Sequence, residues 1–307
     1  MYRVHGWQGL APSLRGASVA LGNFDGVHLG HAKLLHAAHA ARPDAPLAVL
    51  SFEPHPRELF RPDDAAFRLT LPDMRAELLA GLGVGILYEL KFDQVLADFT
   101  AQEFLDTIIG RGIGARQVCC GTDFAFGHRR GGDVDLLGRW CEQAGVGLTV
   151  VPPLVDRQGP ISSSRIRRLL QDGYPGPAAR ELGRLFKLRG EVKHGDALGR
   201  TLGFPTANIG LGRQIEPARG VYAVRVDGQG AGLAGAGGVA NIGRRPTVGG
   251  QESRLELHIL DWTGDLYGQI LDVSLVEFLR PEQKFPGLDA LRAQIGRDAA
   301  AARVRLG

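Results

Sequence analysis

The spacing of the apolar segments, and the type of sequence between them, change near residue 184. This change limits the possible folds more than any other feature of the sequence. Before it, short apolar runs alternate with helical patterns, which predicts a parallel β-sheet with helices on both faces. After it, β-rich runs are separated by Gly and Pro, and no helical pattern returns until about residue 287. That pattern predicts an antiparallel barrel or sandwich, and we expect a barrel closed by a C-terminal helix. We therefore expect an α/β domain over residues 1–184 and a β-barrel domain over residues 185–307.

The individual elements follow from these patterns. In the first half, strands are expected at Ser18–Leu21, Leu47–Phe52, Gly85–Leu90, Gln117–Cys120 and Gly147–Val151, with helices near 31–41, 72–82, 101–110, 133–145 and 163–171. Later strands are expected at Phe186–Val192, Gly220–Val226, Gly238–Asn241, Leu255–Leu260 and Ile270–Leu279, followed by a helix at Leu288–Leu306. The Gly- and Ala-rich run Gly228–Gly238 predicts a flexible hairpin loop. Thr100 and Glu103 predict a capping box at a helix start.

Composition narrows the class of protein. The formal net charge of +3 over 307 residues fits small anionic ligands but is too weak to indicate nucleic acid binding. No apolar stretch is long enough to span a membrane, and the first residues lack the pattern of a secretion signal. The three cysteines, Cys119, Cys120 and Cys141, have no metal-binding spacing and predict small buried side chains. We expect a cytoplasmic monomer or weak homo-oligomer that binds neither nucleic acid nor membranes.

The segment Leu21–His31 places two histidines around a glycine, between a predicted strand and a predicted helix. Backbone N–H groups at such a turn and helix start bind anions. His28 and His31 can donate hydrogen bonds to phosphate oxygens, and Gly30 lets the backbone approach a ligand closely. The pattern therefore predicts a nucleotide triphosphate site, although two histidines at this spacing can also be purely structural.

Three further segments follow predicted strands: Ser51–Pro56, Gly121–Gly127 and Ile161–Arg167. Ligands of open α/β sheets bind at the carboxyl ends of the strands, so all three are expected near the histidine turn. The serines and Arg165 of the last segment suit a phosphate group. Each segment alone has a simpler explanation, such as a helix cap or core phenylalanines, but their common position favours one site.

The second half contains a glycine-rich block, Gly190–Asn208, that lacks the pattern of a P-loop. Pro205 stiffens its end, and Thr206 and Asn208 lie two residues apart, on one face of an extended chain. A hydroxyl and an amide oxygen are suitable ligands for Mg²⁺ bound to ATP. An ordinary turn followed by a strand is the alternative explanation.

Further along the barrel sequence, Arg254–Asp261 alternates as a half-buried strand, with Arg254, Glu256 and His258 on one face. If this face belongs to a pocket, Glu256 can accept a proton from a hydroxyl group as a general base. A solvated strand face is the commoner case and stays open at this point. Phosphoryl transfer requires little else than positioning and charge neutralisation.

The motifs of both halves together resemble those of the bacterial bifunctional riboflavin kinase/FAD synthetase family. G-x-F-D-G-V-H-x-G-H, F-x-P-H-P, G-x-D-F-x-F-G and I-S-S-S-R-I-R resemble its Rossmann-like FMN adenylyltransferase half. G-R-x-L-G-F-P-T-A-N, G-V-Y-A-V, N-I-G-x-R-P-T and L-E-x-H-I-L-D-W resemble its riboflavin kinase half. The resemblance implies that riboflavin is phosphorylated to FMN and that FMN is adenylylated to FAD, with ATP and Mg²⁺ in both steps.

The resemblance also implies roles for individual residues. His28 and His31 contact ATP phosphates, Glu256 is the catalytic base for the ribityl 5′-hydroxyl, and Thr206 and Asn208 are ligands of Mg²⁺·ATP. Nucleotide or flavin binding is expected for the remaining motif residues: Gly22, Asn23, Phe24, Gly30, Asp123, Ser162, Ser163, Ser164, Arg165, Gly190, Gly195, Gly199, Arg200, Asn241, Arg245 and Thr247. Metal ligands in the first half stay open.

Three rival interpretations remain. One half could be inactive and serve only as a scaffold, although both sets of motifs are intact. The chain could be a non-catalytic flavin-binding regulator that acts on RNA, but no basic and aromatic RNA surface is visible in the sequence. A class I aminoacyl-tRNA synthetase also has a histidine–glycine–histidine turn, but this chain is short for one and lacks a recognisable second signature.

Overall fold

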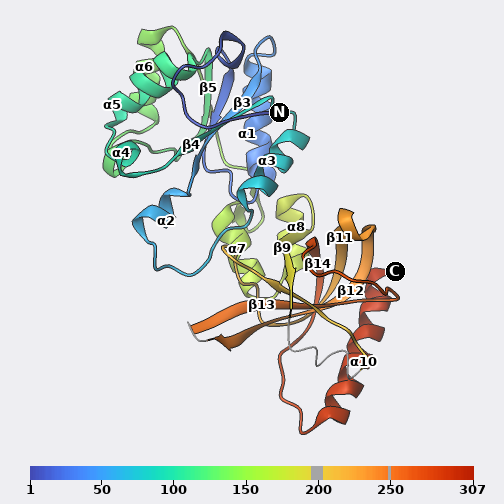
Figure 1. Cartoon of the computed structure of the whole chain (residues 1–307). Coiled ribbons are helices and arrows are strands. Elements are labelled where there is room, and N and C mark those ends of the chain that lie inside the picture. Colours follow the sequence, from blue (N-terminus) through green and yellow to red (C-terminus); the bar gives the residue numbers. More distant parts are fainter. Residues whose placement is uncertain (195–202, 248–249) are drawn as a thin grey trace. The chain divides into compact units, whose positions relative to one another are not determined.

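A parallel sheet of six strands, in the order β1-β4-β3-β2-β5-β6, forms the centre of the first of two structural units (Figure 1). The computed structural model describes residues 1–194, 203–247 and 250–307. The first unit contains Met1–Asp64 and Pro72–Ser162. Its sheet consists of β1 (Tyr2–Val4), β2 (Ser18–Leu21), β3 (Leu47–Glu53), β4 (Ile86–Lys91), β5 (Gln117–Gly121) and β6 (Gly147–Val151).

Helices cover both faces of this sheet. Helices α1 and α3 cover one face, and α4 to α6 cover the other (Figure 1). Buried side chains of each group lie in separate core clusters. The helices are α1 (Leu29–Ala41), α2 (Pro56–Phe60), α3 (Pro72–Gly81), α4 (Gln94–Ala97), α5 (Ala101–Glu103) and α6 (Val134–Ala144), with a π-helix at Phe104–Ile113 and 3₁₀ turns at Pro12–Leu14 and His128–Arg130. A small hairpin of β7 (Val155–Asp156) and β8 (Gly159–Pro160) follows the sheet.

The predicted parallel sheet is confirmed, with two local differences. The sequence analysis missed β1, whose three residues are too few to show a period but pair in register with β4. The capping box of Thr100 and Glu103 is present, yet the helix it starts continues as a π-helix over ten residues. The apolar period alone does not distinguish the two helix types.

A closed antiparallel barrel, in the order β10-β13-β12-β11-β14-β9, dominates the second unit. This unit contains Ala65–Leu71 and Ser163–Gly307. Its strands are β9 (Phe186–Lys193), β10 (Ala207–Gly210), β11 (Gly220–Gly228), β12 (Leu233–Thr247), β13 (Gly250–Ile259) and β14 (Ile270–Pro281), with a 3₁₀ turn at Gln229–Ala231. Its helices are α7 (Ser163–Gln171), α8 (Pro175–Leu182) and α10 (Leu288–Leu306).

The predicted barrel and both helices Ser163–Gln171 and Leu288–Leu306 are confirmed, but the predicted loop at Gly228–Gly238 is wrong. Beyond the 3₁₀ turn, most of this run is the start of β12, where Ala236 lies opposite Val226 of β11 and packs on the barrel core. Small residues have low intrinsic strand propensity, and here pairing with the neighbouring strand overrides it. The short strand β10 was also missed.

The segment Ala65–Leu71 belongs to the second unit although the sequence around it belongs to the first. Leu69 is 1% exposed and lies in the same core cluster as α7, α8 and the barrel strands. The backbone of Arg68 bonds to Arg213 and Ile215, and Arg167 of α7 donates from Nε to the carbonyl of Phe67 at 2.7 Å. The functional boundary between residues 184 and 185 stays a prediction.

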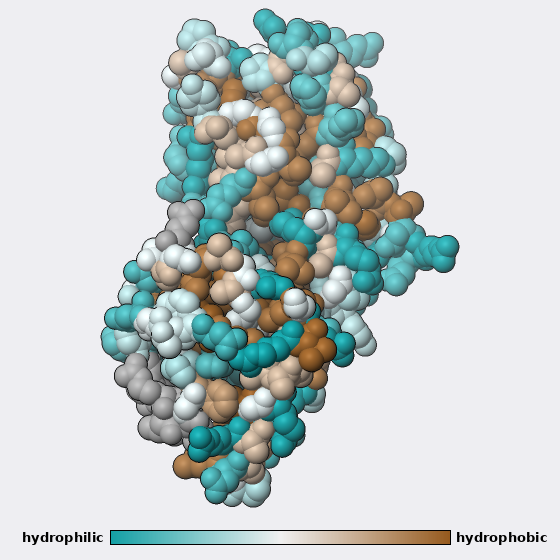
Figure 2. All heavy atoms as spheres, turned by 90° about the vertical axis from the view of Figure 1, so that its right-hand side faces the viewer, coloured by the Kyte–Doolittle hydropathy of each residue, from teal (hydrophilic) through white to brown (hydrophobic). Residues whose placement is uncertain are grey.

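The surface mixes polar and apolar residues. Figure 2 shows hydrophilic residues interspersed with apolar ones on the face it presents. Exposed apolar side chains such as Phe60, Val95 and Val304 come from different elements. Of the helices within the described ranges, none has both the length and the apolar character needed to cross a membrane.

Candidate active sites

The first candidate site lies where β2 ends, between its neighbours β3 and β5. The chain passes from β2 to β3 on one side, whereas β5 lies on the other side of β2. This is the topological switch point of the sheet, where open α/β sheets bind their ligands. The turn from Gly22 to His28 therefore starts in the expected place, and α1 begins directly after it.

His28 and His31 cap each other's backbone at the start of α1. The Nδ1 atom of His28 accepts the N–H of His31, and Nδ1 of His31 accepts the N–H of His28, both at 3.3 Å. The two rings are stacked, with centroids 3.7 Å apart and an interplanar angle of 16°. Since each Nδ1 accepts a hydrogen bond, neither carries a proton in this arrangement, and each Nε2 carries the N–H. In this arrangement the proton of each imidazole therefore lies on Nε2.

Close packing holds this histidine pair in place. Phe24 is fully buried, has a positive φ of 52°, and its ring centroid lies 4.8 Å from that of His31. A Cβ at Gly30 would come within 3.0 Å of the His28 ring and 3.5 Å of the carbonyl oxygen of Ile161. The close approach of the His28 ring therefore favours glycine at position 30.

Two other predicted segments lie at the same edge of the sheet as this turn, within the first unit. Ile161, and with it Ser162, lies beside Gly30, and Lys33 of α1 donates from Nζ to the carbonyl of Pro152 at 2.8 Å. Asp123 lies in the turn directly after β5, the neighbour of β2. The prediction that these segments gather at one edge of the sheet is thus confirmed for Gly121–Gly127 and for the start of Ile161–Arg167.

The serine–arginine segment is divided between the two units. Ser163, Ser164 and Arg165 begin α7 of the second unit. Nε of Arg165 lies 2.7 Å from Oε1 of Glu181 on α8, and the side chains of both residues are largely buried. Arg165 was expected to face a phosphate, and in the structure this part of its guanidinium is directed at a carboxylate.

A buried arginine that the sequence analysis missed lies below the histidine turn. Arg75 of α3 is 2% exposed and is one of the largest fully buried side chains. Its Nη1 is 3.4 Å from the carbonyl oxygen of Asn23, and its Nη2 contacts Glu53 at 3.3 Å and Glu89 at 2.6 Å. No sequence signal distinguishes this arginine from the solvated arginines of other helices.

The second candidate site is a row of polar residues across three strands of the barrel. Glu256 of β13 pairs with Asn208 of β10 on one side and with Asn241 of β12 on the other. Directly paired residues point to the same face of a sheet. Leu255 and Leu257 are buried inside the barrel, so this row lies on its outer face. The sequence predicts a face for Asn208 and for Glu256, and the strand register brings both together with Asn241.

The segment before β10 is held against the same face. Nδ1 of His258 is 2.9 Å from the carbonyl oxygen of Pro205, and the rings of His258 and Phe204 meet edge to face. Nη1 of Arg254 is 3.4 Å from Oδ1 of Asn208. Thr206 is half-buried between these contacts. The sequence analysis noted Arg254 and His258 on the face of Glu256 but gave them no role.

The remaining predicted residues of the second unit lie on β9, on β12 or outside the described residues. Gly190 lies within β9, where a Cβ would come 2.6 Å from the Ile209 side chain, so close strand packing explains it. Arg245 and Thr247 lie on β12, with their backbones opposite Glu252 and Gly250. Gly195, Gly199 and Arg200 lie outside the described residues.

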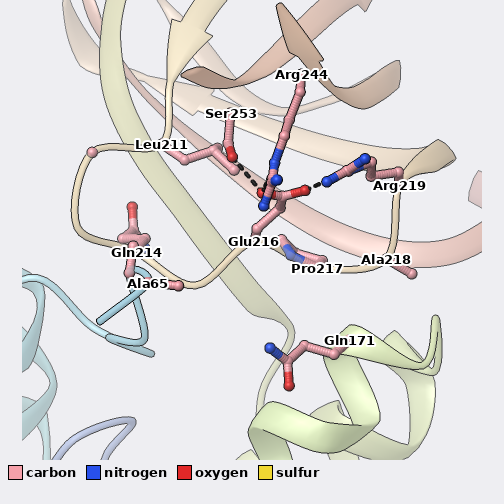
Figure 3. Close-up of a pocket in the computed structure, with 12 residues that line it drawn as sticks. Ala65, Gln171, Leu211, Gln214, Glu216, Pro217, Ala218, Arg219, Arg244 and Ser253 are labelled. Atoms are coloured by element: carbon pink, nitrogen blue, oxygen red, sulfur yellow. Dashed lines mark hydrogen bonds and ion pairs between the residues drawn. The ribbon is translucent and has the colours of Figure 1, made fainter. Parts of the chain in front are cut away.

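A separate pocket of about 660 Å³ in the second unit contains none of the predicted residues (Figure 3). Arg219 and Arg244 converge on Glu216, with Nε–oxygen distances of 2.7 and 2.9 Å, and Ser253 donates to the same carboxylate. Burial raises the pKa of Glu216, but these hydrogen bonds outweigh it and hold the pKa below its usual value. The charged groups drawn there thus satisfy one another.

Family models match both units. A model described as FAD synthetase matches residues 10–165, and a model described as riboflavin kinase matches residues 182–306. The predicted resemblance of each half is therefore confirmed, in the predicted order along the chain.

Curated relatives match almost the whole chain. A bifunctional riboflavin kinase/FMN adenylyltransferase of Escherichia coli K12 is 42% identical over 290 residues, which cover 94% of this chain and 92% of the relative. A relative of the same description from Pseudomonas fluorescens is 43% identical over 310 residues, covering 99% and 97%. One from Bacillus subtilis is 36% identical and covers 91% and 89%.

A solved structure shares the fold of this chain. The crystal structure of a protein described as a macrolide-efflux protein from Streptococcus pneumoniae has a TM-score of 0.87, 33% identity and 99% coverage of both chains.

An α/β unit with a histidine–glycine–histidine turn, joined to a flavokinase barrel, defines a bifunctional enzyme of flavin cofactor synthesis. The chain belongs to the family of bacterial bifunctional riboflavin kinase/FMN adenylyltransferases. It accordingly has both riboflavin kinase and FAD synthetase activity.

Proposed function

We propose that the barrel face around Glu256 phosphorylates riboflavin to FMN and that the histidine turn of the first unit adenylylates FMN to FAD. The observation that supports the second assignment is the reciprocal cap of His28 and His31, which puts the proton of each ring on Nε2 at the switch point of the sheet. The row of Asn208, Glu256 and Asn241 supports the first assignment.

In the adenylyl transfer step, a phosphate oxygen of FMN attacks the α-phosphorus of ATP, and pyrophosphate leaves. Negative charge grows on the leaving group, and hydrogen-bond donors aimed at that charge lower the barrier. His28 and His31 supply such donors without losing a proton. Gly22, Asn23 and Phe24 shape the turn, and Asp123, Ser162, Ser163, Ser164 and Arg165 are proposed to bind the nucleotide or flavin.

In the kinase step, the 5′-hydroxyl of riboflavin attacks the γ-phosphorus of ATP, the bond from this phosphorus to the bridging oxygen breaks, and ADP leaves. Glu256 is exposed on the outer barrel face, so its carboxylate is accessible to a substrate hydroxyl and can accept its proton. Gly190, Gly195, Gly199, Arg200, Asn241, Arg245 and Thr247 are proposed to line the same nucleotide and flavin site.

The residues before and on β10 suit a magnesium ion bound to ATP. Within the described ranges, no group of three or more His, Cys, Asp or Glu side chains is arranged to hold a metal by itself. Thr206 and Asn208 offer a hydroxyl and an amide oxygen, which are hard ligands that leave room for phosphate oxygens. Mg²⁺ bound there would neutralise charge on the phosphates, while the two side chains orient the nucleotide.

We propose further that the protein acts in the cytoplasm on small molecules only, as a monomer or weak homo-oligomer. The weak net charge of +3 supports the absence of a nucleic acid partner. Size-exclusion chromatography with light scattering tests the oligomeric state.

The whole assignment is tested by incubating the protein with riboflavin, ATP and Mg²⁺ and separating the flavins by chromatography. FMN should appear first and FAD later. FAD should also form from supplied FMN without riboflavin. If FMN accumulates and no FAD forms even after long incubation, or if supplied FMN gives no FAD, the role given to the first unit is contradicted.

A further inference from the structure

His258 contacts the segment that carries the proposed metal ligands. It lies two residues after Glu256 on the same face of β13, and its Nδ1 is 2.9 Å from the carbonyl oxygen of Pro205. A carbonyl oxygen only accepts hydrogen bonds, so Nδ1 carries the proton in this contact. The bond holds the peptide group that joins Pro205 to Thr206.

Two constraints meet at this peptide group. The proline ring fixes φ of Pro205, and the hydrogen bond from His258 fixes the plane of the peptide that follows. Together they determine the direction in which the chain enters Thr206. The His258 ring also packs edge to face on Phe204, with centroids 5.4 Å apart and an interplanar angle of 84°.

The other neighbour of Glu256 on this face contacts the far end of the same segment. Nη1 of Arg254 is 3.4 Å from Oδ1 of Asn208, which pairs directly with Glu256 across the strands. The segment from Pro205 to Asn208 is therefore contacted by side chains on both sides of Glu256.

We infer that His258 is a positioning residue of the kinase site, whose Nδ1–H bond to Pro205 sets the direction in which Thr206 and Asn208 present their oxygens. The inference rests on the metal-binding role proposed above for these two residues. It predicts that the hydrogen-bond donor, rather than the ring or its charge, is the feature that the site requires.

Two substitutions separate the donor from the ring. In His258→Asn, the amide nitrogen takes nearly the position of Nδ1, so a donor to Pro205 is kept and the ring is lost. In His258→Phe, the ring contact with Phe204 is kept and the donor is lost. Loss of one such bond predicts that kcat/KM for ATP in FMN formation falls about tenfold in His258→Phe and far less in His258→Asn.

A binding measurement makes the test independent of turnover. The affinity for ADP is measured by calorimetry with and without Mg²⁺, and the quantity compared is the gain in affinity that the metal gives. Thr206→Ala and Asn208→Ala are the reference variants that lose this gain. His258→Phe is expected to lose about the same share of it, whereas His258→Asn keeps it.

The outcomes distinguish the inference from the function on which it rests. If Thr206→Ala and Asn208→Ala keep the gain in ADP affinity that Mg²⁺ gives, the proposed metal-binding role is wrong. The inference about His258 is then wrong as well. If these two variants lose the gain and His258→Phe does not, only the inference is overturned. Equal losses in His258→Asn and His258→Phe would also overturn it. Near-UV circular dichroism checks that each variant is folded, and FAD synthesis from supplied FMN checks that the first unit is unaffected.

Discussion

Nη2 of Arg75 lies 2.6 Å from Oε1 of Glu89, and the two side chains are only 2% and 1% exposed. The other oxygen of Glu89 is 2.7 Å from Nη2 of Arg3, on the edge strand β1. Because Arg75 also reaches Glu53 and the carbonyl of Asn23, one buried network connects β1, β3, β4 and the histidine turn. This network fixes the edge of the sheet on which adenylyl transfer is proposed to occur.

Glu89→Gln should destabilise the first unit strongly. The change leaves the buried Arg75 guanidinium without its closest charge partner, and breaking buried pairs typically costs roughly 3–5 kcal/mol. Urea unfolding measures the loss. In a Trp262→Phe background, the remaining two of three tryptophans, Trp7 and Trp140, both belong to the first unit and report on it by fluorescence.

Asp73→Asn is the matched control for that experiment. Asp73 pairs with the same Arg3 at 2.6 Å, but its side chain is 76% exposed. An exposed ion pair contributes at most about 1 kcal/mol. Equal destabilisation by Glu89→Gln and Asp73→Asn would contradict the view that burial makes the Glu89 network important.

His28→Asn should separate the two functions of His28. Asparagine is a good N-cap, so helix α1 keeps its cap, but the Nε2–H donor is lost. FAD synthesis should fall about 100-fold, as for the loss of one preorganised donor, with little change in stability. His28→Ala should lose the same activity and about 1 kcal/mol of stability as well. FMN formation by the same protein is the internal control, and its loss in a folded variant would contradict two separate sites.

The reciprocal cap makes a direct prediction for the tautomers of His28 and His31. Long-range ¹H–¹⁵N correlation spectra of the free protein near pH 8 should show the proton on Nε2 of both rings. A proton on Nδ1 of either ring would mean that the hydrogen bond to its Nδ1 is absent in solution. The spectrum of His31→Gln assigns the signals.

Glu256→Gln should abolish FMN formation and leave FAD synthesis from supplied FMN intact. A positioned general base contributes about 10²–10⁴-fold to the rate, and the amide has no basic oxygen to replace it. Glu277→Gln is the control, because Glu277 is a half-exposed carboxylate of β14 that pairs with Arg305. Rates of FMN formation measured by chromatography should be normal in that variant.

The cysteines should be unreactive in the folded protein. Burial raises the pKa of Cys120 to about 12 and that of Cys141 to about 11, and it also raises the pKa of Cys119. Native protein at pH 8 should react slowly with a disulfide reagent, and urea should expose three thiols.

The raised pKa values also make stability depend on pH. Since the folded pKa values are raised, the thiols favour the folded state fully below the unfolded pKa value of 9.0. This contribution is lost as the pH rises above 9, so urea midpoints should fall between pH 8 and pH 10. Rapid labelling of the native protein at pH 8 would contradict the prediction that the buried cysteines are unreactive.

The sequence predicted those parts of the fold and site that local patterns encode. The apolar runs of β2 and β5, the serine-initiated helix α7 and the histidine turn each carry their signal within a few neighbouring residues. The gathering of the turns at one edge followed from the rule for parallel sheets.

Other features depend on partners that are distant in the chain. The row of Asn208, Glu256 and Asn241 exists because of the register of β10, β13 and β12, and a shift of one residue would turn Glu256 inward. The short strands β1 and β10 are ordered by their neighbours. Arg75 lies in an ordinary helical sequence. Its burial depends on ion pairs with Glu53 and Glu89, which are distant in the chain.

The segment Ala65–Leu71, which adds Leu69 to the core of the barrel unit, has a consequence for how the enzyme is made. No single cut in the chain separates the two structural units, because a fragment beginning at residue 185 lacks this segment as well as Ile166 and Leu170 of α7. During synthesis, the segment Ala65–Leu71 of the barrel unit is made before residues 72–162 of the adenylyltransferase unit. The sheet of the adenylyltransferase unit can form before the barrel has been synthesised. The side chain of Leu69 is buried only after the barrel strands have been made.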